Sequence, residues 1–270
     1  RGIHAVTAWN HGAFELYVPE HEQTRARAEL RAADAEERET QRALRDELAR
    51  RRRPATRHAF AGGLIVAALL SGFFALTGPR ASGAAWFHAG ASDAERVLHG
   101  EWWRAVTALT LHADGAHVAS NIGIGALVVG AVMRSEGVGW GASLVLGAGT
   151  LGNLINAWAH QSLHSSVGFS TAVFGAIGLL GGLGYAHGRG RKHAARPAWT
   201  ALAGSLALLA ALGSSERSDL FAHLFGGLAG VGFGLTFGLA GWRPTSAAGQ
   251  WLAGLGAAAA VVAAWFTALA

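Results

Sequence analysis

The chain has 270 residues, of which 51% are hydrophobic and 14% are charged, and it contains no cysteine. This composition excludes an ordinary soluble globular domain and a disordered chain, and the missing cysteine excludes disulfides, thiolate metal sites and a cysteine nucleophile. Residues 1–58 hold 22 of the 39 charged residues. The positive excess is almost all arginine and lacks a basic–aromatic surface pattern, so it favours a lipid bilayer and not nucleic acid as the partner.

Residues 1–58 are predicted to form a charged cytoplasmic segment. The stretch Ala13–Val18 is typical of a short strand that stops at Pro19, and Glu20–Arg53 is typical of one long polar helix. We interpret the segment as a fragment of a small α/β domain or, equally well, as a charged linker. Because the chain begins at Arg1 and has a single methionine, we expect a truncated or processed product.

The rest of the chain is a series of apolar stretches near the roughly 20 residues that a helix needs to cross a bilayer. The seven stretches are Ala59–Gly78, Gly115–Met133, Gly137–Ala157, Val167–Ala186, Pro197–Gly213, Leu220–Gly241 and Trp251–Ala270. They predict an all-α polytopic membrane protein, with six core transmembrane helices in residues 59–242 and one additional helix in residues 243–270.

The arginines and lysine in the loops predict the orientation. If the side that precedes the first stretch is cytoplasmic, Arg50–Arg57 and the inside loops together hold 11 positive residues and the outside loops hold 4, in agreement with the positive-inside rule. This places the N-terminus in the cytoplasm and the C-terminus outside. The composition, which is rich in Arg, Ala and Gly, favours a bacterial inner (cytoplasmic) membrane.

Polar residues inside the apolar stretches indicate a site, because such groups usually face a cavity or a partner. His117 and Asn121, Ser170, and His223 lie near the starts of the second, fourth and sixth stretches. These three stretches all run from outside to inside in the predicted topology. The four side chains should therefore share a shallow depth below the outer surface, as in a water-accessible cavity.

The residue types in this cavity suggest a catalytic serine. A serine hydroxyl needs an adjacent base, and His223 is the base best matched in depth to Ser170. His117 and Asn121 share one helical face and could donate hydrogen bonds to an oxyanion, alongside the Ser170 N–H. Phe174 could pack on the His223 ring. Asp219 is a poor third candidate for a triad, because it more plausibly begins the sixth helix.

These residues resemble the rhomboid family of intramembrane serine proteases. The resemblance covers residues 59–242 and rests on Gly168-Phe169-Ser170 with Phe174, His117-x-x-x-Asn121, Ala222-His223-x-x-Gly226-x-x-x-Gly230, Trp103-Arg104 and His112. The seventh stretch looks like the six-plus-one arrangement of some members.

The resemblance implies a serine endopeptidase that hydrolyses peptide bonds of transmembrane protein substrates near the outer membrane face, with a Ser170–His223 dyad and no cofactor or metal. His117 and Asn121 would stabilise the oxyanion, and Gly168, Phe169, Phe174, His112, Trp103, Arg104 and Gly226 would bind substrate or support the site. Thr171 departs from the glycine that usually follows the serine. This departure keeps open the alternative of a catalytically inactive homologue that binds membrane helices.

Other interpretations of these residues also remain open. Trp103 and Arg104 could shape or anchor the first outer loop, and His160 and His164 could contact substrate or, as we favour, be simply solvated. A small transporter could use His117 and His223, but no two related halves are apparent. A metalloprotease is disfavoured, because the sequence has no H-E-x-x-H motif.

Overall fold

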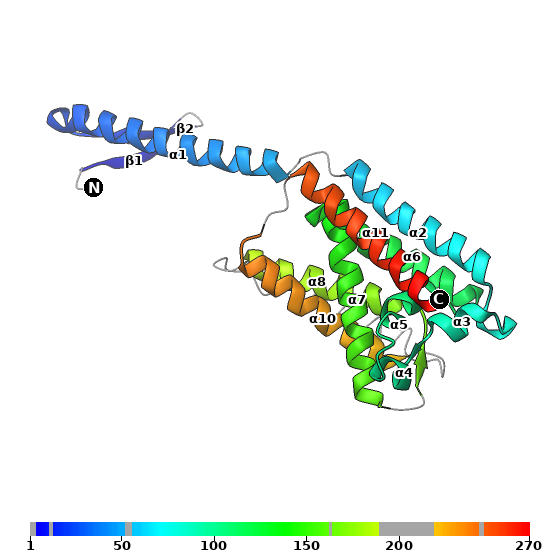
Figure 1. The fold of residues 1–270 in the computed structure, drawn as a ribbon. Helices are drawn as coiled ribbons and strands as arrows, with labels where there is room; N and C mark the ends of the chain where they lie inside the picture. Colours follow the sequence, from blue (N-terminus) through cyan, green and yellow to red (C-terminus); the bar gives the residue numbers. More distant parts are fainter. Residues whose placement is uncertain (1–3, 11–12, 52–55, 162–163, 189–218, 243–245) are drawn as a thin grey trace. The chain divides into compact units, whose positions relative to one another are not determined.

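The computed structural model describes residues 4–10, 13–51, 56–161, 164–188, 219–242 and 246–270 (Figure 1). The chain forms two compact units, Arg1–Pro54 and Ala55–Ala270.

The first unit is a hairpin followed by a long helix. Strands β1 (Val6–Asn10) and β2 (Ala13–Tyr17) pair antiparallel, a 3-10 turn η1 (Glu20–Glu22) follows Pro19, and α1 covers Gln23–Arg51. The sequence predicted β2 and the long helix, whereas β1 was not predicted.

The second unit is a bundle of apolar helices. Its long helices are α2 (Thr56–Thr77), α6 (Gly115–Glu136), α7 (Val138–His160), α8 (Ser170–Gly188), α10 (Leu220–Leu239) and α11 (Ala247–Leu269). Within the described part of the chain, five helical segments are long and apolar enough to cross a membrane: Ala61–Ser82, α6, α7, α10 and α11. This confirms the predicted class, a polytopic all-α membrane protein. The fifth predicted stretch, Pro197–Gly213, lies outside the described residues, so the predicted helix count stays a prediction.

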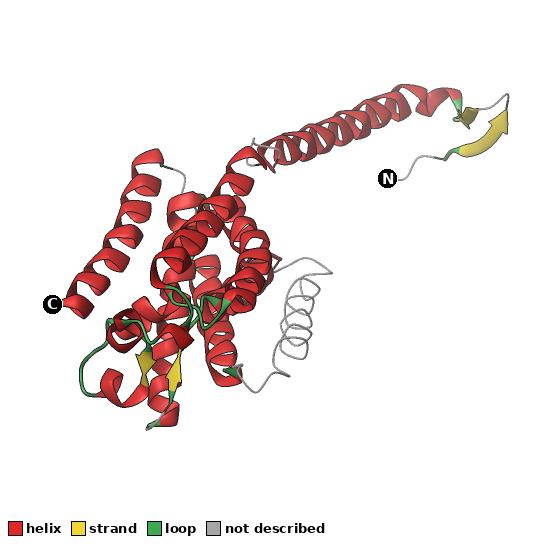
Figure 2. Ribbon diagram, turned by 90° about the vertical axis from the view of Figure 1, so that its right-hand side faces the viewer, coloured by secondary structure: helices red, strands yellow, loops and turns green. Residues whose placement is uncertain are grey.

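Short elements fill the connection between α2 and α6. They are η2 (Arg80–Ser82), α3 (Ala85–Gly90), β3 (Ser92–Asp93), α4 (Ala94–Leu98), α5 (Arg104–Thr107) and η3 (Ala108–Thr110). Strand β3 pairs antiparallel with β4 (Ser165–Ser166), which precedes α8; Figure 2 shows these two short strands within an otherwise helical unit. The connection between α2 and α6 is thus attached directly to the segment that leads into Ser170.

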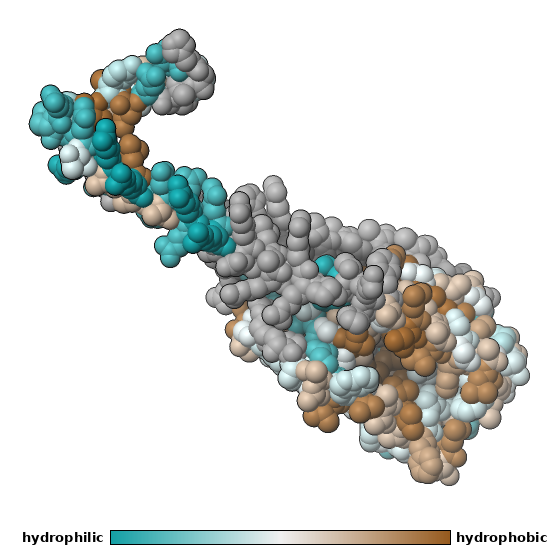
Figure 3. Space-filling view, turned by 90° about the horizontal axis from the view of Figure 1, so that it is seen from above, coloured by the Kyte–Doolittle hydropathy of each residue, from teal (hydrophilic) through white to brown (hydrophobic). Residues whose placement is uncertain are grey.

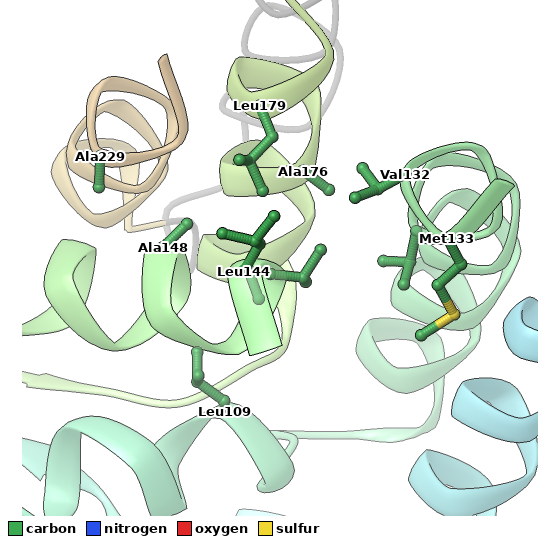
Figure 4. Close-up of a cluster of buried hydrophobic side chains, with 11 residues drawn as sticks. Leu109, Val132, Met133, Leu144, Ala148, Ala176, Leu179 and Ala229 are labelled. Atoms are coloured by element: carbon green, nitrogen blue, oxygen red, sulfur yellow. The ribbon is translucent and has the colours of Figure 1, made fainter. Parts of the chain in front are cut away.

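The core of the bundle lies where α6, α7, α8 and α10 meet. Leu144 and Ala148 of α7 pack against Ala176 and Leu179 of α8, and α6 and α10 close the cluster (Figure 4). The outward surface carries many large apolar side chains, such as Leu252 and Phe266 of α11, both more than 70% exposed. Figure 3 shows hydrophobic residues on the surface of this unit, whereas α1 is mostly hydrophilic. An apolar exterior of this kind suits lipid and not water.

Candidate active site

Ser170 and His223 lie in direct contact. Ser170 is the first residue of α8, and His223 is in the first turn of α10. The Ser170 Oγ and the His223 Nε2 are 2.8 Å apart, a hydrogen-bond distance, although 53 residues separate the two in sequence. His223 is 5% exposed and Ser170 is half-buried, so the histidine is the more enclosed of the two.

Glycines allow this contact by letting α10 approach α8 at the level of the backbone. A Cβ at Gly226 would touch the carbonyl oxygen of Thr171, and a Cβ at Gly230 would touch that of Gly175. Because both contacts advance by four residues, the two helices run parallel. The starts of α8 and α10 therefore lie at the same end of the bundle, as the predicted topology required.

The His223 ring is held by stacking. Its centroid lies 4.5 Å from that of Phe174, with 20° between the planes, which is the packing that the sequence suggested. Among the described residues, the buried Nδ1 of His223 has no hydrogen-bond partner. The Asp219 carboxylate instead accepts a hydrogen bond from the Ala222 N–H and begins α10 as its N-cap. The described geometry is that of a dyad without a third, orienting carboxylate.

His117 lies beside the segment that precedes Ser170. The backbone of Gly168 has φ +132°, and a Cβ there would approach the His117 ring within 2.6 Å. Glycine is needed at this position for both reasons, since other residues rarely adopt such a φ. The Asp114 carboxylate caps the start of α6 by accepting a hydrogen bond from the His117 N–H at 2.8 Å.

Asn121 is a buried donor with nothing to bind. It is 5% exposed, and its Nδ2 has no hydrogen-bond partner among the described residues. One turn later, Gly125 packs against Phe169 and Val173. The α6 face that carries Asn121 therefore runs alongside the first turn of α8. Buried polar atoms are usually paired, so the unpaired Asn121 amide is a donor available to a ligand.

His112 is fully buried and fixes the backbone next to the serine. Its Nε2 lies 3.3 Å from the Phe169 N–H, which donates to it. Burial and the neighbouring His117 lower the pKa of His112 to about 4. The neutral ring that this hydrogen bond requires is thus the favoured form near pH 7.

Trp103 and Arg104 support the connection between α2 and α6, and no contact within the described residues joins them to Ser170 or His223. The Arg104 guanidinium is 3% exposed, forms a 2.6 Å ion pair with Glu101, and donates to the carbonyls of His88 and Ala91. Trp103 packs edge-on against Trp102. The sequence left open whether Trp103 and Arg104 anchor this loop at the membrane interface or shape it, and these contacts favour shaping.

The Thr171 side chain occupies a space that two glycines leave open. It is 2% exposed, and its Cγ2 would lie 2.8 Å from a Cβ at Gly152 on α7 and 2.9 Å from a Cβ at Gly226. The side chain that departs from the usual glycine is therefore housed between α7 and α10.

One polar cluster was missed by the sequence analysis. His164 is not simply solvated, as one interpretation held: it contacts the Asp219 carboxylate and stacks on His160. Asn156 of α7 joins them. An amide inside an apolar stretch is the signal that identified Asn121, and it was available for Asn156 as well.

Comparison with known proteins agrees with this geometry. A family model described as the Rhomboid domain matches residues 99–240, which is more than half of the chain and includes Ser170 and His223. Neither the curated proteins nor the solved structures contain a match. Within the described residues, no group of three His, Asp or Glu side chains could hold a metal ion. The chain belongs to the rhomboid family.

Proposed function

We propose that this chain is an active intramembrane serine protease that hydrolyses peptide bonds of transmembrane protein substrates near the outer membrane face. Membership of the rhomboid family makes it such a protease or an inactive homologue. The observation that favours activity is the 2.8 Å hydrogen bond between Ser170 Oγ and His223 Nε2. A nucleophile within hydrogen-bond reach of its base is the arrangement that covalent catalysis needs.

In the proposed reaction, Ser170 Oγ attacks the carbonyl carbon of the scissile bond and its proton passes to His223 Nε2. The tetrahedral intermediate then collapses, the C–N bond breaks, and His223 returns the proton to the leaving amine. Water, activated by the same histidine, hydrolyses the acyl-enzyme. Stacking on Phe174 holds the ring for both transfers, a task that a third residue performs in a triad.

We assign stabilisation of the oxyanion to the Asn121 amide, to His117 and to the N–H of Ser170. Among the described residues the buried Asn121 Nδ2 has no partner, and the His117 ring adjoins Gly168, two residues before Ser170. The Ser170 N–H belongs to the first turn of α8, whose amides have no partners within the helix. Preorganised donors of this kind are often the largest single contribution to catalysis.

The inactive homologue is the alternative, and Thr171 is the residue that raises it. Its side chain is directed toward Gly152 and Gly226, and its backbone N–H is retained. The departure from glycine therefore leaves the face of α8 that carries the Ser170 hydroxyl unobstructed, which favours activity.

Labelling with a fluorophosphonate probe tests the proposal. Purified wild-type protein should label covalently, whereas Ser170→Ala and His223→Ala should not, at unchanged melting temperatures. Thr171→Gly serves as the matched variant for the alternative. If the wild type fails to label and Thr171→Gly labels, the chain is an inactive homologue because of Thr171; if neither labels, the dyad assignment is wrong.

We further propose the division into a cytoplasmic segment 1–58, a catalytic unit 59–242 and an additional helix 243–270 that ends outside, in a bacterial inner membrane. The distribution of arginines supports this orientation. Because the chain has no cysteine, single cysteines placed at Ser82 and at Ala270 can be probed with an impermeant maleimide in intact cells. Both should react; protection of either one contradicts the topology.

A further inference from the structure

The Asp219 carboxylate joins three segments of the outer end of the bundle. Its Oδ1 accepts the Ala222 N–H at 3.0 Å, which begins α10. Its Oδ2 accepts hydrogen bonds from His164 Nε2 at 2.6 Å and from Asn156 Nδ2 at 2.8 Å. The side chain of Ser166 bonds to the same carboxylate. One carboxylate thus links the end of α7, the segment before Ser170, and the start of the helix that carries His223.

The segment that holds His164 is itself fixed on the way to Ser170. The His164 carbonyl accepts the Ala94 N–H at 2.9 Å, and the Gly168 N–H donates to the Ala108 carbonyl at 2.9 Å. His160 stacks on His164 from the other side, with centroids 3.9 Å apart. The position of His164 is therefore set by α7 and the first outer loop together. Because Asp219 begins α10 and bonds to His164, this hydrogen bond defines where α10 begins.

We propose that Asp219, His164 and Asn156 form a clasp that positions His223 against Ser170, so that these three are positioning residues of the dyad. The inference rests on the proposed function. The glycine contacts of α8 and α10 lie on the inner side of the dyad, and the clasp lies on its outer side. His223 follows Asp219 by one helical turn, and the two attachments together fix its approach to Ser170.

His164 and Asp219 of the clasp both carry a charge at mildly acidic pH. The hydrogen bond to Asp219 raises the pKa of His164 above 6.5, against the opposing effect of burial. Burial opposes ionisation of Asp219, but the hydrogen bonds from His164 and Ala222 outweigh it and hold the Asp219 pKa well below 3.8. An ion pair therefore forms at mildly acidic pH, and it weakens as rising pH deprotonates His164.

Other titratable or charged groups around the clasp come from each neighbouring element. His160 of α7 stacks on His164, Arg80 of η2 donates to the Ser165 hydroxyl, and Asp93 of β3 lies opposite Ser165 in the ladder. His223 of α10 lies one turn from Asp219. Only His164 shares a hydrogen bond with Asp219 among these groups, so replacing it isolates the effect of the clasp.

The test is the second-order rate constant for fluorophosphonate labelling of Ser170, measured from pH 5 to pH 9 in the purified full chain. His164→Ala should label about tenfold more slowly, since small displacements of a catalytic base have effects of this order or larger. His164→Gln should label at an intermediate rate, because its amide can donate to Asp219 but carries no charge. Asp219→Asn keeps the cap for Ala222 but removes the charge, and should also slow labelling. His99→Ala is the matched control, because His99 is exposed and bonds only to the Glu95 carbonyl of its own helix.

The pH profile distinguishes positioning from general stability. As the pH rises through the raised pKa of His164, the wild-type rate should decline toward that of His164→Gln, which should lack this decline. If the wild type labels and His164→Ala labels at the same rate, the clasp is refuted but the dyad is not. The same alkaline decline in His164→Gln also refutes only the clasp. A wild type that does not label overturns the dyad itself, and with it the positioning role.

Discussion

Replacing Gly226 with alanine should separate the two catalytic residues. A Cβ at this position would touch the Thr171 carbonyl oxygen and would lie 2.9 Å from Thr171 Cγ2. Non-bonded carbons rest about 3.5–4.0 Å apart, so α10 must move away from α8 by about 0.6–1 Å. Thr171 directly follows Ser170, which means that the displacement acts at the level of the dyad.

This displacement is enough to break the catalytic hydrogen bond. The separation of Ser170 Oγ and His223 Nε2 would grow from 2.8 Å to beyond the hydrogen-bond limit of about 3.2 Å. We expect the labelling rate constant of Gly226→Ala to fall by about 10²-fold. Overpacking should lower the free energy of unfolding by about 1–3 kcal/mol.

The assay is fluorophosphonate labelling at a temperature at which wild type and variant are both folded, with a thermal melt of each. Gly232→Ala provides the control, because it makes the same chemical change on the same helix and its Cβ would have nothing within 4 Å. The control should match the wild type in both measurements. A Gly226→Ala protein that labels and melts like the wild type would refute the view that close approach of these helices creates the dyad.

Three further outcomes are expected. Asn121→Ala should lower kcat by about 10²–10³-fold without lowering the melting temperature, and a loss below about threefold would make Asn121 a packing residue. Because burial lowers the pKa of His112 from 6.5 to about 4, the folded protein binds fewer protons than the unfolded chain between these values, and its stability should fall as pH falls across this window. The side chain of His112→Gln can still accept the Phe169 N–H but does not titrate. Between pH 6.5 and pH 4, its free energy of unfolding, measured by urea titration, should therefore fall by about 3 kcal/mol less than that of the wild type. Trp265→Phe removes the 3.0 Å hydrogen bond from the Trp265 indole to Thr110 and should lower stability by about 1 kcal/mol in the same titration; an unchanged value would show that this bond does not secure α11.

The sequence alone determined the class of the fold, because hydropathy over about 20 residues is a local property. It also located the candidate nucleophile and base. A polar group in an apolar stretch is conspicuous without any knowledge of packing, and Ser170 and His223 stand at matching depths in two stretches. The strand β1 (Val6–Asn10) was missed, since it is stabilised by pairing with β2 and carries little signal of its own.

Tertiary structure decided what each candidate touches. Asp219 was placed correctly as a helix start, but its bond to His164 joins residues 55 apart, and no local pattern specifies such a pair. The accommodation of Thr171 depends in the same way on Gly152 and Gly226, which belong to two other helices. Distances between helices are fixed by how side chains interlock across the whole bundle, so a single chain sequence can nominate a serine and a histidine, while only the packed bundle brings them to 2.8 Å.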